Sequence, residues 1–334
     1  MEAWLAIALA LAYAATNGFH DAANAIATLV ATRGARPGHA IVLSAAFNLL
    51  GSLVIGTAVA TTIAGIVSID GRAAIGVIGA GLAGAVLWGL ATWLAGLPSS
   101  SGHALVGGLV GAALADAGSG AIGWGGFDGW RPTGLVGVLV ALAVSPVVGV
   151  ALGFLLTRLL ARALRRATRH VRGPIRGAEW AMSAMLSLSH GANDAQKAMG
   201  VIAAVLLADG RTGALEVPLW AKLACGAALT VGTALGGWRI VRTIGRGIVR
   251  LRQVDGLASQ TGSTAVILAA SAIGAPVSTT QVVASSVVGV GGGRGRWGHV
   301  RWSVVRAMGL AWVTTVPACA ALGALALLLW RAAA

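Results

Sequence analysis

Charged residues are scarce in this sequence, and their scarcity excludes an ordinary soluble domain. Only 10% of the 334 residues are Asp, Glu, Lys or Arg, whereas soluble globular domains contain about 25%. Disorder is excluded for the opposite reason, because 57% of the residues are hydrophobic and a disordered chain has little apolar material. The mean hydropathy is +0.84. We therefore expect an all-α polytopic membrane protein.

Cysteines and nucleotide-binding motifs are scarce or absent. The two cysteines, Cys225 and Cys319, lie in apolar runs and are expected to pack in the interior rather than form a disulfide or a metal site. No G-x-x-x-x-G-K-[ST] loop occurs, so ATP is not the expected energy source. Neither an enzyme nor a cofactor is predicted. The net charge of +14 is explained by basic loops beside a membrane, and no nucleic-acid partner is expected.

Ten apolar segments have about the 20 residues that a membrane-spanning helix needs. They cover residues 3–32, 38–69, 73–96, 97–115, 133–157, 178–208, 218–238, 256–274, 275–292 and 303–330. The segments 3–32 and 178–208 have polar centres and are candidates for broken helices. The segments 97–115 and 275–292 begin with proline and hydroxyl residues and are candidates for re-entrant segments. The prediction is ten to twelve transmembrane or re-entrant segments.

Basic residues are concentrated in four of the loops between these segments. If all ten segments cross, the loops 33–38, 158–177, 239–252 and 294–306 share one side and carry 18 of the 24 Lys and Arg residues. The positive-inside rule places this side in the cytoplasm and both termini outside. A mixture of crossing and re-entrant segments can keep this arrangement. The expected location is the plasma (inner) membrane of a bacterium.

Two polar motifs occur in both halves of the chain, in the same order. Residues 17–26 read NGFHDAANAI and residues 190–199 read HGANDAQKAM, while residues 96–107 read GLPSSSGHALVG and residues 274–285 read GAPVSTTQVVAS. Each half contains five segments, an odd number, so the second half would enter the membrane from the opposite side. This pattern predicts an inverted-topology repeat. The first repeat covers 1–157, a basic linker 158–177 and the second repeat 178–334.

The first motif places carboxylates and amides inside apolar segments. Asp21 and Asn24 are three residues apart and share a face if they are helical, and Asn193 directly precedes Asp194. Ionisable groups in a membrane are costly and usually functional. We therefore expect these four residues to form the site of a coupling ion. Their oxygens suit a hard cation such as sodium, and a carboxylate there alternatively carries a proton.

The second motif supplies hydroxyl donors just after a proline, a residue favoured at the start of a helix. The hydroxyl residues are Ser99, Ser100, Ser101, Ser278, Thr279 and Thr280. A helix N-terminus offers free N–H groups and a positive dipole end, which bind oxyanions. Two such helix starts that face each other would hold a tetrahedral anion. His20, His103 and His190 also lie inside the motifs and are candidates for a proton relay or for simple hydrogen bonding.

The four motifs resemble those of a known family. The motifs at 17–28 and 190–200 are similar to the paired GANDxANA-type signatures of the inorganic phosphate transporter (PiT) family. Those at 98–103 and 276–281 are similar to its P-x-S-T-T-H element. The resemblance covers both halves and implies an inverted-repeat fold and symport of phosphate with sodium or protons. It also implies that the carboxylate and amide residues bind ions and phosphate, and that the six hydroxyl residues hold phosphate.

The second copy of the first motif departs from the family pattern at Lys197, which stands where Asn is usual. This form resembles bacterial, proton-coupled members of the low-affinity type. An ammonium three residues after Asp194 can replace a bound cation or touch the anion directly. We expect Lys197 to favour proton coupling, and the alternative is that it snorkels to an interface. Gly102 and Gln281 replace the usual Thr and His, so a symmetric role for His103 is not expected.

The sequence therefore predicts a secondary active symporter that imports inorganic phosphate with protons by alternating access. The phosphate is taken as the free ion or as a metal–phosphate complex. Sodium-coupled symport and a sulfate permease of the same fold are the alternatives. An anion channel is a different class, disfavoured by the repeat and the embedded acids. The expected partners are phosphate and the lipid bilayer, and a homodimer is the candidate assembly.

Overall fold

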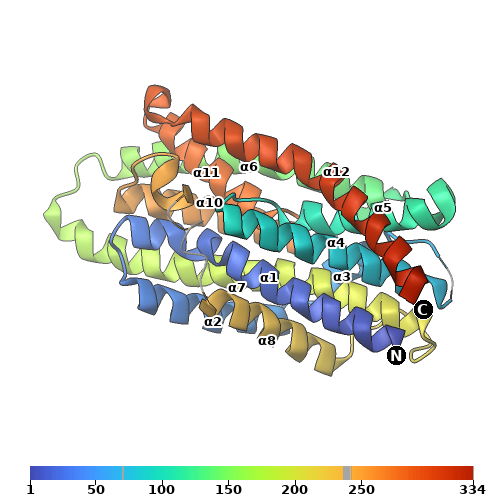
Figure 1. The fold of residues 1–334 in the computed structure, drawn as a ribbon. Helices are drawn as coiled ribbons and strands as arrows, with labels where there is room; N and C mark the ends of the chain where they lie inside the picture. Colours follow the sequence, from blue (N-terminus) through green and yellow to red (C-terminus); the bar gives the residue numbers. More distant parts are fainter. Residues whose placement is uncertain (70, 236–240, 242, 334) are drawn as a thin grey trace.

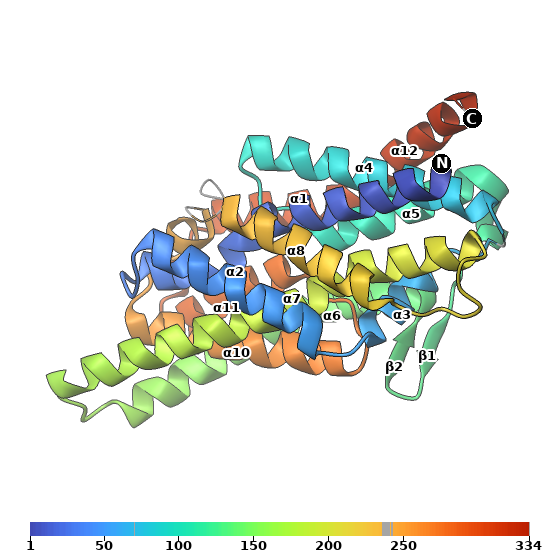
Figure 2. The ribbon, with the colours of Figure 1, turned by 90° about the horizontal axis from the view of Figure 1, so that it is seen from below.

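Long helices that run back and forth along one axis make up most of the protein in the computed structural model (Figure 1). The structure describes residues 1–69, 71–235, 241 and 243–333. Within these ranges the strands are β1 (Gly126–Asp128) and β2 (Arg131–Thr133), which pair as a small antiparallel hairpin (Figure 2). The predicted all-α polytopic class is confirmed.

The helices follow the predicted segments closely. The first half of the chain contains α1 (Glu2–Ala31), α2 (Pro37–Val54), α3 (Ala58–Ala64), α4 (Ala73–Ala95), α5 (Ser101–Ala117), η1 (Gly118–Ala121) and α6 (Gly134–Ala163). The second half contains η2 (Arg169–Val171), α7 (Arg172–Ala208), α8 (Leu219–Leu235), the π-helical turn η3 (Thr243–Gly247), α10 (Gln253–Ala272), α11 (Thr279–Gly293), η4 (Trp297–His299) and α12 (Trp302–Ala333). In the described ranges five helices are long and apolar enough to cross a bilayer, namely α2, α4, α5 with η1, α6 and α12.

The helices α1 and α7 are continuous through their polar centres. The expectation of broken helices at 3–32 and 178–208 is therefore wrong. Several of the polar side chains find partners on neighbouring helices, as His190 of α7 does with Asn48 of α2. The backbone keeps its own helical hydrogen bonds through both polar centres, as a lipid environment requires.

The helices α4 and α5 form a hairpin that enters and leaves at one end of the protein. They touch closely, since a Cβ added at Gly108 would lie 2.1 Å from the carbonyl oxygen of Gly81. Arg72, just before α4, lines a cavity together with Met1. At the end of α5, Asp116 forms an ion pair with Arg331 of α12. The outer ends of the segments 73–96 and 97–115 therefore lie at the same end of the protein, and the re-entrant course of 97–115 stays a prediction.

The helices α10 and α11 form a second hairpin at the opposite end of the protein. Asp255 at the start of α10 lies 2.7 Å from Arg294, which directly follows α11. The segments 73–96 and 256–274 are thus the partners of 97–115 and 275–292, the two segments predicted to be re-entrant. The four segments form two hairpins, and the two ends of each hairpin lie at the same end of the protein. The four basic loops therefore share one side, as predicted for ten crossing segments.

Both hairpins turn at a left-handed glycine. Gly96 has φ 68° and Gly274 has φ 77°, a conformation that residues with a side chain rarely adopt. Each glycine ends its helix, and Pro98 or Pro276 follows two residues later, which prevents the helix from continuing. The next helix of each hairpin therefore starts in the interior of the protein.

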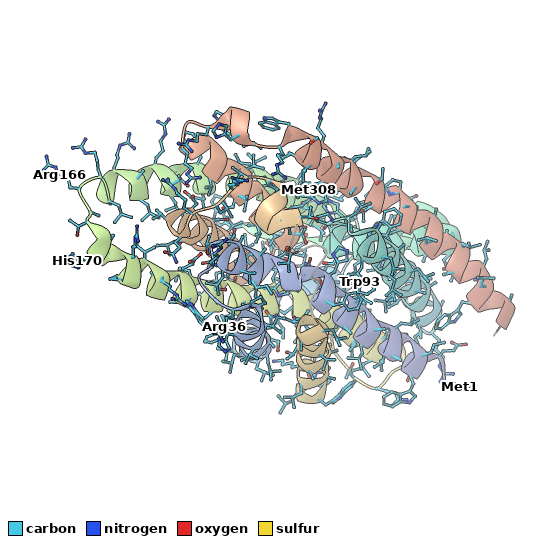
Figure 3. The ribbon with its side chains drawn as sticks, turned by 60° about the vertical axis from the view of Figure 1, so that its left-hand side comes forward. Met1, Arg36, Trp93, Arg166, His170 and Met308 are labelled. Atoms are coloured by element: carbon cyan, nitrogen blue, oxygen red, sulfur yellow. The ribbon has the colours of Figure 1, made fainter. Side chains whose placement is uncertain are left out.

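Arginine-rich loops lie at one end of the molecule and both chain termini at the other (Figure 1). Figure 3 shows Arg36, Arg166 and His170 at the first end and Met1 at the second. We call these the arginine end and the terminal end. The helices α6 and α7 extend beyond their neighbours at the arginine end (Figure 2). Residues 239, 240 and 242 of the predicted basic loop 239–252 lie outside the described residues.

Glycines bring the helices that carry the first motif into backbone contact. A Cβ added at Gly18 would lie 2.2 Å from the carbonyl oxygen of Leu229, and one at Gly191 would lie 2.0 Å from that of Asn48. Neither position has room for a side chain. These contacts fix α1 against α8 and α2 against α7, and so set the depth at which Asp21 and Asp194 lie.

Candidate substrate and ion site

The repeated motifs meet in the interior of the protein. Asp21 and Asn24 come from the middle of α1, Asp194 and Lys197 from the middle of α7, and Thr280 from the first turn of α11. Each of these residues is at most 1% exposed. Residues far apart in the chain, from both of its halves, thus form one buried polar cluster.

Asp21 accepts hydrogen bonds from hydroxyls of both Ser/Thr motifs. Thr280 Oγ1 donates to Asp21 Oδ1 at 2.5 Å. Ser101 Oγ and Thr279 Oγ1 lie 3.2 Å and 3.3 Å from Asp21 Oδ2. Asn24 Nδ2 donates to Thr280 Oγ1 at 3.1 Å, which orients that hydroxyl toward the carboxylate. The hydroxyls predicted to hold an anion are therefore held by a carboxylate in this structure.

Asp21 has no Lys or Arg partner among the described residues. The nearest basic atoms are His20 Nδ1 and His190 Nε2, each 4.0 Å from a carboxylate oxygen. These histidines carry a charge only when protonated. Asp21 is therefore the site carboxylate without a permanent cation beside it.

Asp194 has a permanent cation in Lys197. Lys197 Nζ forms an ion pair with Asp194 Oδ1 and donates to the carbonyl oxygen of Val277 at 2.8 Å. His190 Nε2 lies 2.8 Å from Asp194 Oδ2. The Lys197 side chain is 0% exposed, so the alternative that it snorkels to an interface is wrong. A Cβ added at Gly102 would lie 3.6 Å from Lys197 Nζ, which places the ammonium beside the start of α5.

Three ligand atoms gather at the centre of the cluster. An oxygen of Asp21, an oxygen of Asp194 and a ring nitrogen of His190 lie within 4.8 Å of one another. Thr279 Oγ1 lies 2.9 Å from Asp194 Oδ2 as well as 3.3 Å from Asp21 Oδ2. The two carboxylate oxygens and the hydroxyl oxygen of Thr279 suit a hard cation, because hard cations prefer oxygen ligands. The same two carboxylates could instead share a proton.

Two serines cap the helices that start at the site. Ser100 Oγ accepts from the backbone N–H of His103 at 3.2 Å, and Ser278 Oγ accepts from that of Gln281 at 3.3 Å. Such N-caps stabilise a helix start. His103 Nδ1 also lies 2.7 Å from Ser100 Oγ. Two capped N-termini with their positive dipole ends thus point toward the carboxylates.

Two predicted site residues, Ser99 and Asn193, bond to partners other than Asp21, and so does the Nε2 atom of His20, whose Nδ1 atom lies 4.0 Å from Asp21 Oδ1. Ser99 Oγ lies 2.9 Å from Thr92 Oγ1, and His20 Nε2 lies 3.2 Å from the same hydroxyl. Asn193 Nδ2 donates to Ser271 Oγ at 3.0 Å and to the carbonyl oxygen of Ala275 at 3.2 Å. Asn193 therefore holds the turn between α10 and α11, while Ser99 and His20 join α4 to α1.

The sequence reasoning missed two buried amides. Asn48 Oδ1 lies 3.0 Å from His190 Nδ1, and Asn48 Nδ2 donates to Thr233 Oγ1 at 2.9 Å, so Asn48 orients the histidine that contacts Asp194. Neither polar atom of Asn17 has a partner. Both residues carry the same signal as Asn24, an amide inside an apolar segment.

Asn17 lines a small cavity beside the cluster. Its volume is ≈ 10 Å³, and Tyr13, His20 and Ser101 also line it. The volume is close to the minimum that one water needs. A water there would satisfy Asn17 and lie next to the hydroxyl that donates to Asp21.

The long apolar helices and the buried polar site between two hairpins are those of a class of protein, the polytopic membrane transporters. The sequence profile described as "Phosphate transporter family" matches residues 17–173 and 164–323. The chain belongs to this family, whose members are transporters and not enzymes.

Individual relatives agree with the family assignment. The chain is 41% identical over 321 residues to a "Probable low-affinity inorganic phosphate transporter" of Rhizobium meliloti, covering 96% of this chain and 93% of the relative. It is 39% identical over 328 residues to a Bacillus subtilis protein with the same description, covering 96% and 95%. A solved structure titled "The sodium-dependent phosphate transporter" matches with a TM-score of 0.86 at 23% identity, covering 99% of both chains. At this identity the structural match shows the fold alone.

Proposed function

We propose that the chain is a secondary active symporter that imports inorganic phosphate together with protons. The observation that carries the proposal is the difference between the two site carboxylates. Asp194 is paired with the buried Lys197, whereas Asp21 has only hydroxyl and histidine neighbours. A carboxylate without a fixed cation must be neutralised when an anion approaches it, and a proton does this with the least rearrangement.

Charge balance in the cluster supports the coupling. Asp21, Asp194 and Lys197 together carry a net charge of −1 when the histidines are neutral. Phosphate adds further negative charge to a site from which water is excluded, where like charges repel strongly. Protonation of Asp21 removes the repulsion and releases the hydroxyls that now donate to it. Proton and phosphate therefore favour each other's binding.

The phosphate ligands in this proposal are the donors around Asp21. They are the hydroxyls of Ser101, Thr279 and Thr280, the free N–H groups of the first turns of α5 and α11, and the ammonium of Lys197. Ser100 and Ser278 act by capping the two helices. Sulfate offers the same oxygens, but phosphate near neutral pH still carries a hydroxyl group, which can donate a hydrogen bond to the carbonyl oxygen of protonated Asp21, whereas sulfate has no such donor. A neutral metal–phosphate complex would satisfy the same donors.

A sodium-coupled mechanism is the second candidate, and one observation favours it. The ligand atoms of Asp21, Asp194 and His190 lie within 4.8 Å of one another, a spacing from which a small cation could be bound. In that case sodium would neutralise Asp21 in place of a proton. Asp194 would remain paired with Lys197, so one fewer cation would bind than with two unpaired carboxylates.

We further propose that residues 1–157 and 178–334 are inverted repeats and that the two hairpins move during alternating access. Each hairpin has a left-handed glycine, a proline and a capping serine at corresponding places, and the two enter from opposite ends. The arginine end is cytoplasmic in a bacterial plasma membrane by the positive-inside rule.

A buried polar stripe between the site and the arginine end is the proposed inner half of the path. Gln260 Nε2 of α10 donates to Thr28 Oγ1 of α1 at 2.8 Å, and Thr32, directly after α1, donates to Glu179 of α7. Within the described part of the chain Gln260 Oε1 and Glu179 Oε2 have no partner. Water would satisfy these atoms if α10 separated from α1. By contrast, the final turns of α7 read AMGVIAAVLLA and offer no polar side chain.

Uptake of radiolabelled phosphate into proteoliposomes tests the proposal. A proton gradient and a sodium gradient are imposed separately on liposomes that contain the purified protein. We expect the proton gradient alone to drive uptake, and excess sulfate to leave it unchanged. Chelation of divalent metals separates free phosphate from a metal–phosphate complex.

Each other outcome has a definite meaning. Uptake that needs sodium replaces proton coupling with the second candidate and keeps the site. Loss of the phosphate signal in excess sulfate would mean that the protein transports sulfate or another oxyanion rather than phosphate alone. Phosphate flux that neither gradient can drive uphill contradicts symport and favours a channel.

A further inference from the structure

A basic cavity at the arginine end lies outside the transport site. It has a volume of ≈ 500 Å³ and is lined by Arg250, Arg294, Arg296, His299 and Arg301, with Val249 and Gly291. No carboxylate is among the lining residues. The cavity lies between the segment that follows η3, the end of α11 and the start of α12.

Most of the positive charge in this cavity is not balanced. Arg294 pairs with Asp255 at 2.7 Å, but within the described ranges Arg250, Arg296 and Arg301 have no ion pair with a carboxylate. The Arg294 side chain is only 9% exposed, and its Nε has no hydrogen-bond partner among the residues that the structure describes. A buried guanidinium N–H without an acceptor is costly. This cluster of guanidinium groups therefore suits an anion with several acceptor oxygens.

An apolar groove adjoins the basic cavity. It has a volume of ≈ 310 Å³ and is lined mainly by Val288, Val305, Met308 and the rings of Trp297, Trp302 and Trp312. Trp297 belongs to η4, between Arg296 and His299 of the cavity, and its ring stacks on Trp302 with centroids 6.3 Å apart. Trp297 and Trp302 are 42% and 46% exposed, as expected for tryptophans at a membrane interface.

We propose that the cavity and the groove together bind one anionic phospholipid. The arginines take the phosphate of the headgroup, since guanidinium groups match phosphate geometry, and the tryptophan-lined groove takes an acyl chain. A free phosphate ion would fill only the basic cavity and would leave the groove unexplained. The lipid would join the end of α11 to the start of α12. This site does not depend on the proposed transport function.

Native mass spectrometry of the detergent-purified protein tests the site. The protein is titrated with phosphatidylglycerol and, separately, with phosphatidylcholine of the same chains. We expect one phosphatidylglycerol to be retained selectively. The double variant R296Q/R301Q should weaken this retention about 30-fold, because each basic residue near a membrane surface contributes about fivefold. The control R165Q/R166Q removes the same charge from the exposed turn between α6 and η2 and should retain the lipid.

A second variant distinguishes a lipid from free phosphate. V305W fills the groove and leaves every arginine in place, so it should also lower phosphatidylglycerol retention. Retention should persist in millimolar inorganic phosphate. Equal retention of both lipids, equal loss in the control, or displacement by inorganic phosphate with V305W unaffected would each overturn the proposal.

Discussion

Asp21 and Asp194 lie in similar stretches of sequence but have different partners in the folded protein. Asp194 lies between Lys197 and His190 on its own helix, whereas Asp21 is surrounded by hydroxyls that come from other helices. A buried ion pair keeps its charge state, while a carboxylate without a cation can take up a proton or a metal ion. This asymmetry is the reason that we propose Asp21 as the residue of the coupling step.

Replacement of Asp21 by Asn should abolish coupled uptake. The amide cannot exchange a proton. Its oxygen can still accept from Thr280, and its NH2 group can donate to the hydroxyl oxygen of Ser101, which now donates to Asp21 Oδ2, so the protein should fold. Uptake in proteoliposomes measures the effect. The control is Asp128→Asn, because Asp128 is an exposed carboxylate in the β1–β2 hairpin. Normal uptake by the Asp21 variant would refute the site.

Replacement of Lys197 by Met should destabilise the fold by about 3–5 kcal/mol, because it leaves a buried carboxylate without its partner. The double variant D194N/K197M removes both charges and should regain most of the stability. Thermal unfolding in detergent measures both effects. If the single and double variants unfolded alike, the ion pair would not be the source of the loss. Neither variant should transport phosphate.

At the scale of the elements, the two hairpins bring helix starts into the interior of the protein. A helix that crosses the whole membrane keeps its N-terminus at the surface, where water satisfies the free N–H groups. The helices α5 and α11 instead begin beside Asp21, after the turns at Gly96 and Gly274. Their dipole ends therefore act on whatever anion binds in the interior.

A cross-link between α1 and α10 should stop transport by holding the inner half of the path closed. A Cβ added at Gly256 would lie 3.0 Å from Thr32 Cγ2 and 2.4 Å from Glu179 Oε1. In T32C/G256C the end of the Glu179 side chain must move aside, and the two thiols then come within reach of a disulfide; the reduced double variant measures the effect of that displacement. We expect oxidation to block uptake and reduction to restore it. The single variant T32C under the same oxidant is the control. Uptake that continues after complete cross-linking would show that these helices do not separate.

At the scale of the whole molecule, positive charge is concentrated at one of the two ends. The arginine-rich loops lie together at one end and both termini at the other (Figure 1), even though four of the ten predicted segments form hairpins. Each hairpin adds either two membrane crossings or none, so the loops before and after it stay on the same side of the membrane. The predicted separation of the basic loops from the two termini is therefore kept. This distribution decides the orientation in a membrane.

Cysteine labelling in intact bacterial cells tests the orientation. A membrane-impermeant maleimide should label Asp128→Cys, in the exposed β1–β2 hairpin, and leave Arg166→Cys unlabelled until the cells are permeabilised. The native Cys225 and Cys319 are each 0% exposed and should not react in the folded protein. The opposite labelling pattern would invert the proposed topology.

The membrane class, the approximate segments, the repeated motifs and the basic loops could all be predicted from the sequence. Each depends on composition or local spacing, because the hydrophobic effect and the cost of buried charge act on every residue of these types. Only the tertiary structure decided that α1 and α7 are continuous, that Ser100 and Ser278 cap helices, and that Lys197 points inward. The physical reason is that a buried polar group must find a partner. In this protein the partners come from helices far away in the sequence, which local spacing does not reveal.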